Sequence, residues 1–190
     1  MIYLASSSPR RAELLRQLNI DFKQFAVNID EAVLIDEKPL AYLNRIVQMK
    51  LAVAVDLCGD LSPVLVADTI VCQGDIIMGK PRDFEEFKTF MRRLNNSTHE
   101  VFTAIGIQYQ QTPHFQCVTN TVQFASLSDQ DMCDYWHTAE PQDKAGGYAI
   151  QGIGAMFIKK ITGSFSAIMG LPLYEVMALL KKIGYRHGMN

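Results

Sequence analysis

A serine-rich segment followed by two arginines is the first part of the chain suited to binding an anion. Ser6, Ser8 and Pro9 come shortly before Arg10 and Arg11. Ser8 can cap a helix that has Pro9 at its first position, and a helix N-terminus offers unpaired backbone N–H groups to an anion. Hydroxyl and guanidinium groups add donors for phosphate oxygens. Taken alone, the spacing favours an ordinary helix start with solvated arginines.

Asp68 is the second candidate for a chemical role. It is the only charged residue in the apolar, β-branched stretch at residues 64–72, which is typical of a buried strand. Burying a carboxylate is costly unless it pairs with a cation, binds a metal or ends the strand at a site. Thr69 follows and would point to the opposite face of a regular strand. We interpret this pair as functional.

Two glycine-containing segments supply further candidates. Lys80 stands between Gly79 and Pro81, which by itself favours a turn with a solvent-facing lysine. Residues 143–152 are rich in glycine, which lets a backbone approach a ligand closely, and Gln151 offers a donor and an acceptor for a base edge. The segment lacks the glycine spacing of a dinucleotide fingerprint or a P-loop.

Composition limits the partners that these residues can serve. The 190 residues contain 18 Lys and Arg against 20 Asp and Glu, a formal charge of −2. This balance disfavours a nucleic-acid polymer or an acidic membrane, but a few placed cations can still bind a small polyanion. The four cysteines lack zinc-site spacing and suit a reducing compartment. No signal peptide or membrane span is apparent, so we expect a soluble, cytoplasmic protein.

Hydrophobic patterning predicts the elements that would position the candidates. We expect strands at residues 2–5, 64–72, 76–78, 101–109, 116–124 and 155–161, with a hairpin turn at 110–113. We expect helices from Pro9 through Leu18, from Pro39 through Ala54 with Leu40 on its apolar stripe, from Asp83 to Leu94, from Ser128 to Trp136, and from Pro172 onward. Interleaved strands and helices with a hairpin indicate an α/β fold with a mixed sheet in one domain.

Taken together, the segments resemble the Maf family of nucleoside triphosphate pyrophosphatases. The resemblance rests on residues 5–11, 67–71, 79–82, 99–103, 143–148 and 170–173, in that order along the chain. Each motif alone is weak evidence for the family. The whole set in this order is strong evidence, and it outweighs the interpretation of the serine–arginine segment as an ordinary helix start. The resemblance implies one domain over residues 1–190. It also implies a fold like that of inosine triphosphate pyrophosphatases, with flanking helices, an elongated mixed sheet and a cleft between two lobes.

The resemblance also implies an activity and roles for residues. Family members hydrolyse a nucleoside triphosphate to the monophosphate and pyrophosphate with a divalent cation, Mg²⁺ or Mn²⁺. Asp68 matches the catalytic proton acceptor, while Arg10, Thr69 and Gln151 match positions assigned to substrate selection. The sequence around Gln151 resembles the branch that acts on dTTP and UTP rather than the branch that prefers 7-methyl-GTP. Glu31 matches an acidic position and is expected to bind the metal together with Asp68.

The chemistry of the residues agrees with the roles that the resemblance implies. Ser6, Ser8, Arg11, Lys50 and Lys80 are expected to bind the phosphates, since a triphosphate carries several negative charges. Mg²⁺ needs only one or two protein carboxylates when phosphates complete its shell. A carboxylate can activate water directly or through the metal, and the sequence leaves both routes open.

Two alternatives to this function remain open from the sequence. The chain could be a nucleotide-binding regulator of cell division or septum formation in which hydrolysis is incidental. It could also belong to the 7-methyl-GTP branch. We expect a small nucleotide as partner, no nucleic-acid polymer and no membrane, and a homodimer is the assembly that we would test first.

Overall fold

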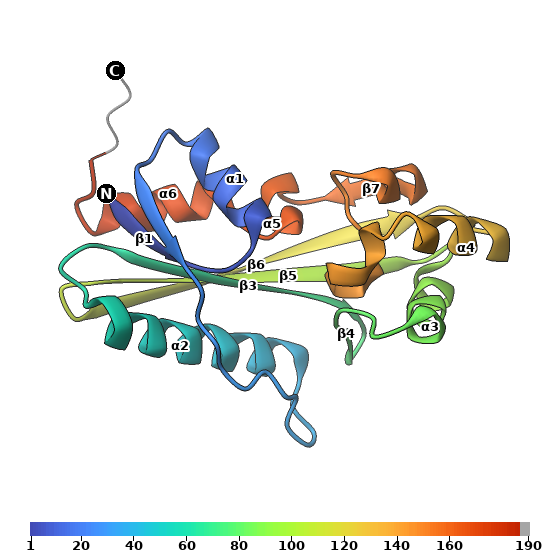
Figure 1. Ribbon diagram of the computed structural model, residues 1–190, viewed down its shortest axis with the longest axis horizontal. Coiled ribbons are helices and arrows are strands. Elements are labelled where there is room, and N and C mark those ends of the chain that lie inside the picture. Colours follow the sequence, from blue (N-terminus) through green and yellow to red (C-terminus); the bar gives the residue numbers. More distant parts are fainter. Residues whose placement is uncertain (187–190) are drawn as a thin grey trace. The chain divides into compact units, whose positions relative to one another are not determined.

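The computed structural model describes residues 1–186, which form two compact units (Figure 1). Unit 1 consists of residues 1–68, 103–118 and the chain from Gly170 on; unit 2 consists of residues 69–102 and 119–169. Across the described residues, seven strands join one mixed sheet in the order β2-β1-β3-β5-β6-β7, with β4 paired to β3. The predicted α/β class with a mixed sheet is confirmed, and the cleft between two lobes stays a prediction.

Unit 1 is built on parallel strands with helices on both faces. β1 (Ile2–Ala5) pairs in parallel with β2 (Phe22–Phe25) and with β3 (Val64–Gln73). Parallel neighbours need long crossovers, which here contain α1 (Pro9–Gln17) and α2 (Pro39–Cys58). In Figure 1, α2 lies along one side of the unit 1 strands, and α1 and α6 (Leu173–Lys182) lie on the other.

Two helices of unit 1, α1 and α2, start where the sequence predicts. Ser8 caps α1 by accepting a hydrogen bond from the backbone N–H of Arg11, and Pro9 takes the first turn. Leu43, Val47, Leu51 and Ala54 form the buried side of α2, as their spacing predicts. Leu40 was expected on the same stripe, but it is 46% exposed in the first turn of the helix. In the last helix, Pro172 is the N-cap and not the first helical residue.

Unit 2 combines antiparallel strands with two amphipathic helices. A tight turn joins β3 to β4 (Ile76–Met78), and β7 (Ile158–Thr162) runs antiparallel to β6 (Thr112–Phe124). β5 is Thr98–Tyr109. Asp83 caps α3 (Phe84–Leu94), and Ser128 with Asp131 forms a capping box for α4 (Asp129–His137), as predicted.

An aromatic cluster forms the core of unit 2. Phe87 of α3 lies 6.1 Å from Tyr135 and 5.1 Å from Trp136, both of α4, measured between ring centroids. Phe124 of β6 packs edge-on against Tyr148 at 4.8 Å. Stacked and edge-on rings of this kind bury large apolar areas in defined orientations. The cluster therefore fixes the segment around residue 148 against the sheet strands of its unit.

Four local features differ from the sequence-based expectation. Strand β6 begins at Thr112, because Gln110 and Gln111 both have positive φ and complete the hairpin turn alone. The segment expected as a strand at 155–161 starts as a 3-10 helix at Ile153–Phe157, and the strand begins only at Ile158. β2 and α5 (Phe165–Met169) were not predicted.

None of the helices in residues 1–186 combines the length and the apolar character that crossing a bilayer requires.

Candidate functional site

Asp68, Lys50 and Glu31 form a charged cluster in unit 1. The Nζ atom of Lys50 lies 2.7 Å from Oδ1 of Asp68 and 2.7 Å from Oε1 of Glu31. The side chains of Lys50 and Asp68 are 11% and 13% exposed, whereas that of Glu31 is 52% exposed. One nearly buried ammonium group is thus shared by two carboxylates, which converge on it from different segments.

The elements explain why these groups meet. Lys50 belongs to the buried side of α2, and Asp68 lies between two buried runs of β3. A buried carboxylate requires a counter-charge, and Lys50 supplies it. The structure places Lys50 against the carboxylates, so its predicted contact with phosphate stays a prediction.

Arg45 and Glu37 order the loop that carries Glu31. Arg45 donates to both carboxylate oxygens of Glu37, at 2.6 and 2.7 Å, and its Nη2 also donates to the carbonyl oxygen of Ala32. These hydrogen bonds lower the pKa of Glu37 to about 2. The Tyr42 hydroxyl donates to the carbonyl oxygen of Glu31 at 3.0 Å, and burial together with the nearby Asp68 and Glu31 charges raises the pKa of Tyr42 to about 12. The backbone of Glu31 is therefore held from α2.

The serine–arginine segment is folded around Ser6. Its Oγ accepts hydrogen bonds from the backbone N–H of Ser8 at 3.2 Å and from Nη1 of Arg11 at 3.3 Å. Nε of Arg11 donates to the carbonyl oxygen of Gly170 at 2.9 Å. Burial lowers the pKa of Arg11, and the charge of Asp68 opposes this shift. Ser6, Ser8 and Arg11 are thus brought together, and Arg10 lies beside them in the first turn of α1.

The carboxylates of unit 1 fit a divalent cation. No group of three or more His, Cys, Asp and Glu side chains suited to a metal ion occurs in residues 1–186. Mg²⁺ does not require one, since one or two carboxylates suffice when substrate phosphates supply the other oxygens. Asp68 and Glu31 already converge on one cationic group, the ammonium of Lys50. Their oxygens are the hard donors that Mg²⁺ and Mn²⁺ prefer.

Thr69, Lys80 and Gln151 belong to unit 2. Thr69 is half-buried and directly follows Asp68 in β3, while Lys80 and Gln151 are exposed. The carbonyl oxygen of Gly79, next to Lys80, accepts a hydrogen bond from the backbone N–H of Gly146 at 3.0 Å. The Lys80 turn and the glycine-rich segment are thereby joined.

Glu140 and Tyr135 are neighbours of Gln151 that the sequence does not point to. Oε1 of Glu140 accepts from the Tyr135 hydroxyl at 2.7 Å and from the N–H of Gly154 at 2.9 Å, and Oε2 accepts from the N–H of Ile153 at 2.9 Å. Burial opposes ionisation, but these hydrogen bonds outweigh it and lower the pKa of Glu140. Glu140 binds a backbone N–H group 13 residues further along the chain, and a contact over this distance leaves no pattern in the sequence from which it could be predicted.

His99 is a further residue to which the sequence assigned no role. Its Nε2 lies 2.7 Å from the Tyr148 hydroxyl, and its side chain is almost completely buried. Burial lowers the pKa of His99 to about 4 and raises that of Tyr148. The pair is neutral at physiological pH and links β5 to the glycine-rich segment.

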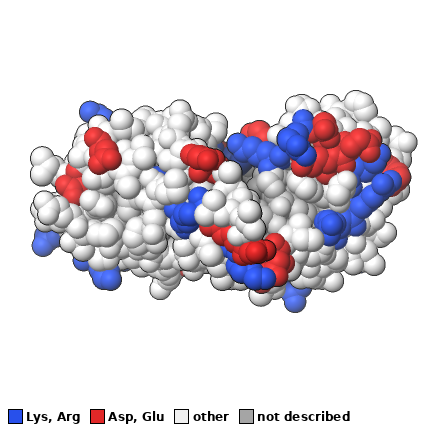
Figure 2. Space-filling model, turned by 90° about the horizontal axis from the view of Figure 1, so that it is seen from below, with Lys and Arg blue, Asp and Glu red and all other residues white. Residues whose placement is uncertain are grey.

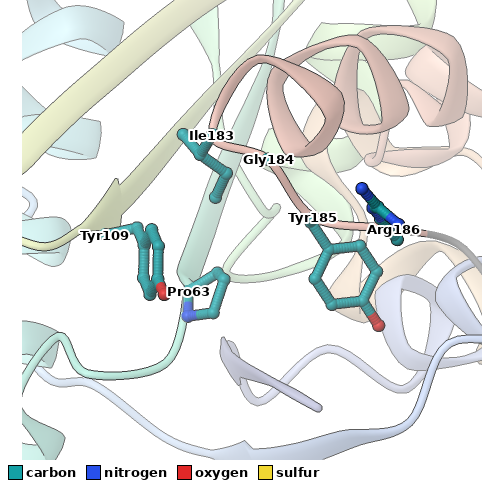
Figure 3. Close-up of a pocket in the computed structure, with 6 residues that line it drawn as sticks. All are labelled: Pro63, Tyr109, Ile183, Gly184, Tyr185 and Arg186. Carbon is teal, nitrogen blue, oxygen red and sulfur yellow. The ribbon is translucent and has the colours of Figure 1, made fainter.

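A pocket of about 300 Å³ in unit 1 has none of the predicted site residues in its lining (Figure 3). It is lined by Pro63, Tyr109, Ile183, Gly184, Tyr185 and Arg186. Its walls hold one charged side chain and no carboxylate, which does not suit metal-assisted chemistry. We assign the cluster around Asp68, and not this cavity, as the candidate catalytic group.

Surface charges of both signs are interspersed on the face drawn in Figure 2. In unit 2, ion pairs join Arg82 to Glu86, Lys88 to Glu85 and Arg92 to Asp129. Such pairing agrees with the near-neutral composition. The expectation that no nucleic-acid polymer binds stays a prediction.

Comparison with known proteins decides the relationship that these residues suggest. The model of a family described as "Maf-like protein" matches residues 1–183. The chain belongs to the Maf family. A protein of Pseudoalteromonas translucida named "dTTP/UTP pyrophosphatase" is 44% identical over 180 residues, which is 95% of this chain and 95% of that protein. One of the same name from Neisseria meningitidis serogroup B is 43% identical over 195 residues, covering 100% of this chain and 96% of the other.

Structural similarity to solved proteins is weaker. A nucleoside-triphosphatase named as a dITP/XTP pyrophosphatase, from Mycobacterium abscessus, matches over 100% of this chain and 99% of its own. Its sequence identity is 14% and the TM-score is 0.47. The assignment to the Maf family therefore rests on the sequence matches.

Proposed function

We propose that this Maf-family chain is a nucleoside triphosphate pyrophosphatase that hydrolyses dTTP and UTP to the monophosphate and pyrophosphate. The observation that carries the proposal is the ion-paired cluster of Asp68, Lys50 and Glu31, with Lys50 Nζ at 2.7 Å from each carboxylate. It occurs in a chain that is more than 40% identical, over nearly its full length, to proteins named dTTP/UTP pyrophosphatase.

The proposed chemistry needs an activated water and a bound triphosphate. Asp68 accepts a proton from the attacking water, whose oxygen forms a bond to phosphorus as the bond between the α and β phosphates breaks and pyrophosphate leaves. Lys50 donates a hydrogen bond to Oδ1 of Asp68 at 2.7 Å and so holds this carboxylate in place. Arg10, Arg11, Ser6 and Ser8 at the start of α1, together with Lys80, bind phosphate oxygens in this proposal.

Asp68 and Glu31 would hold the divalent cation, Mg²⁺ or Mn²⁺. When bound, the cation neutralises charge on the phosphate oxygens during the displacement. Tyr42 and Arg45 contribute by binding the carbonyl oxygens of Glu31 and of the next residue, Ala32. Their contacts leave the Glu31 side chain half-exposed, so it can bind a ligand from solvent.

Base selection is assigned to Gln151, Arg10 and Thr69. The amide of Gln151 can donate to and accept from a pyrimidine edge, since it has both kinds of group. Its exposure leaves these atoms available to a nucleotide. Exchange of Gln151 for Ala should therefore change base preference more than hydrolysis, whereas Gln142→Ala, at an exposed glutamine of the same unit, should leave both unchanged.

A substrate panel tests the proposal. The protein is incubated with dTTP, UTP, CTP, GTP and 7-methyl-GTP in the presence of Mg²⁺ or Mn²⁺, and nucleotide and phosphate products are separated. We expect monophosphate and pyrophosphate from dTTP and UTP. Preferred cleavage of 7-methyl-GTP would place the chain in the other branch, and the absence of monophosphate from every nucleotide would contradict the enzyme proposal.

A regulator of division is the alternative from another class. It predicts that Asp68→Asn retains a cellular effect while Arg10→Ala, which weakens nucleotide binding, loses it. Our proposal predicts that both variants lose the effect together with hydrolysis. A cytoplasmic location, a homodimer and the lack of a membrane or nucleic-acid partner belong to the same proposal, and sedimentation tests the assembly directly.

A further inference from the structure

Glu140 and Tyr135 frame the short segment that carries Gln151. On one side of Gln151, the backbone N–H of Ala149 donates to the Tyr135 hydroxyl at 3.1 Å. On the other side, the N–H groups of Ile153 and Gly154 donate to the Glu140 carboxylate, both at 2.9 Å. The two side chains are joined by the hydrogen bond from Tyr135 to Glu140 at 2.7 Å.

Gly152 shows how closely the carboxylate approaches this segment. A Cβ atom added at Gly152 would overlap with the carboxylate of Glu140. The backbone beside Gln151 is therefore pressed against Glu140 and cannot move toward it. Tyr135 is 2% exposed and is packed in the aromatic core of unit 2, which anchors the far end of the network.

We propose that Glu140 and Tyr135 are positioning residues that set nucleobase selectivity by fixing the backbone on both sides of Gln151. The inference rests on the proposed function, because it concerns how the assigned base-reading residue is held. Neither residue has to touch the nucleotide. An exposed side chain on a fixed backbone loses less conformational entropy on binding than one on a mobile loop, and it presents its amide at a defined place.

The hydrogen-bond chemistry makes Glu140 hard to replace. All three of its partners are donors, and an ionised carboxylate has only acceptor sites. In Glu140→Gln, the amide NH₂ group would face at least one of these donors and lose that hydrogen bond. In Tyr135→Phe, the ring remains in the core while the hydroxyl that binds Glu140 and the Ala149 N–H is removed.

The first measurement is steady-state kinetics of the full chain on dTTP, UTP and GTP. For Glu140→Gln and Tyr135→Phe we expect KM for dTTP to rise about tenfold, equivalent to ~1.4 kcal/mol of binding. The ratio of kcat/KM for dTTP to that for GTP should fall, while kcat for dTTP changes little. Glu85→Gln, the same exchange at a 75% exposed carboxylate of unit 2, serves as the matched control and should behave as wild type.

A double-mutant cycle separates positioning from general destabilisation. If Glu140 acts through Gln151, Glu140→Gln should lower base selectivity in the wild-type background and have no further effect on selectivity in a Gln151→Ala background. Additive losses of selectivity would contradict the inference. Hydrogen exchange of the Ile153 and Gly154 amides, which needs no substrate, should be faster in Glu140→Gln than in Glu85→Gln.

The outcomes distinguish this inference from the proposed function. If the wild-type chain hydrolyses the nucleotides but Glu140→Gln and Tyr135→Phe keep its selectivity and KM, the positioning inference is wrong and the proposed function stands. If the wild-type chain hydrolyses none of them, the proposed function is wrong, and the inference falls with it.

Discussion

Lys50 lies between two carboxylates, and its charge has a measurable energetic consequence. Its Nζ is 2.7 Å from both Asp68 and Glu31, and the residue is 9% exposed. Removing one partner of a nearly buried ion pair leaves the other charge without compensation. The same lysine holds Asp68, the proton acceptor of the proposed mechanism, by a hydrogen bond. Stability and activity should therefore both depend on it.

For Lys50→Met we expect loss of most pyrophosphatase activity and a decrease of about 1–3 kcal/mol in the free energy of unfolding, less than for a fully buried pair because Glu31 is half-exposed. Urea unfolding and dTTP hydrolysis measure the two effects. Lys88→Met is the matched control, since Lys88 pairs with the exposed Glu85 and should cost no more than about 1 kcal/mol. Equal losses of stability in the two variants would contradict the role assigned to Lys50.

Candidate residues could be found from the sequence where an unusual type interrupted a pattern. Asp68 stood out because a carboxylate lay in an apolar strand, and the structure pairs it with Lys50, a cation being one of the three explanations left open. Glu140 and Tyr135 gave no such signal. They act through hydrogen bonds to backbone groups at residues 149, 153 and 154, which only the folded chain brings near.

At the scale of elements, the glycine-rich segment is fixed by a close approach to β3. Gly146 has φ +70°, its N–H binds the carbonyl oxygen of Gly79, and a Cβ added to it would lie 2.9 Å from the side chain of Val71. Only glycine fits both the left-handed backbone and the lack of space. The segment is thereby packed on the strand that also carries Asp68 and Thr69.

Gly146→Ala should lower the free energy of unfolding by about 2–4 kcal/mol, because backbone strain and steric overlap add. Gly74→Ala is the matched control: Gly74 has φ +59° but nothing within 4 Å of an added Cβ, so only the strain of about 1–2 kcal/mol remains. The difference in the free energy of unfolding between the two variants, measured with urea, gives the cost of the steric overlap alone. If Gly146→Ala costs no more than Gly74→Ala, the close packing against Val71 is not important for stability.

Elements with local start signals were predictable, and elements held by distant partners were not. Asp83 and Ser128 cap α3 and α4 as expected, since capping depends on residues three positions apart. β2 is four residues long with exposed Lys23 and Gln24, so it lacks a buried pattern. The stretch from Ile153 turned out to start as a 3-10 helix, where Glu140 binds the first amides.

At the scale of the whole molecule, the chain alternates between its two units, and unit 2 carries a buried histidine that makes its stability depend on pH. The pKa of His99 falls from 6.5 to about 4 in the folded state because of burial. Between these values the unfolded chain binds more protons than the folded one. The contribution of His99 to stability is therefore complete above pH 6.5 and is lost as the pH falls toward 4.

The expected loss from this histidine is about 2 kcal/mol between about pH 7.5 and about pH 5. Trp136, the single tryptophan, packs 5.1 Å from Phe87 in the same core and reports unfolding of unit 2 by fluorescence. Urea titrations at both pH values should show this loss in the wild type and a smaller one in His99→Gln. Equal losses would show that His99 is not the group that titrates.

The fold class could be predicted from the order of strands, helices and motifs along the chain. Errors in the bounds of single elements do not change this order. The mixed sheet and the Maf family were both predicted in this way. The resemblance implied two lobes, but the bounds of the two units were not predicted, since they depend on which parts of β3, β5 and β6 pack with which helices.

Pyrophosphate release from dTTP by the wild type and by Asp68→Asn tests the central claim most directly. Asp129→Asn, at a 73% exposed carboxylate, is the control. With Mg²⁺ present, we predict equimolar dTMP and pyrophosphate from the wild type and the control, and a rate at least about 100-fold lower from a folded Asp68→Asn. Release of dTDP and inorganic phosphate, or wild-type rates in Asp68→Asn, would contradict the account.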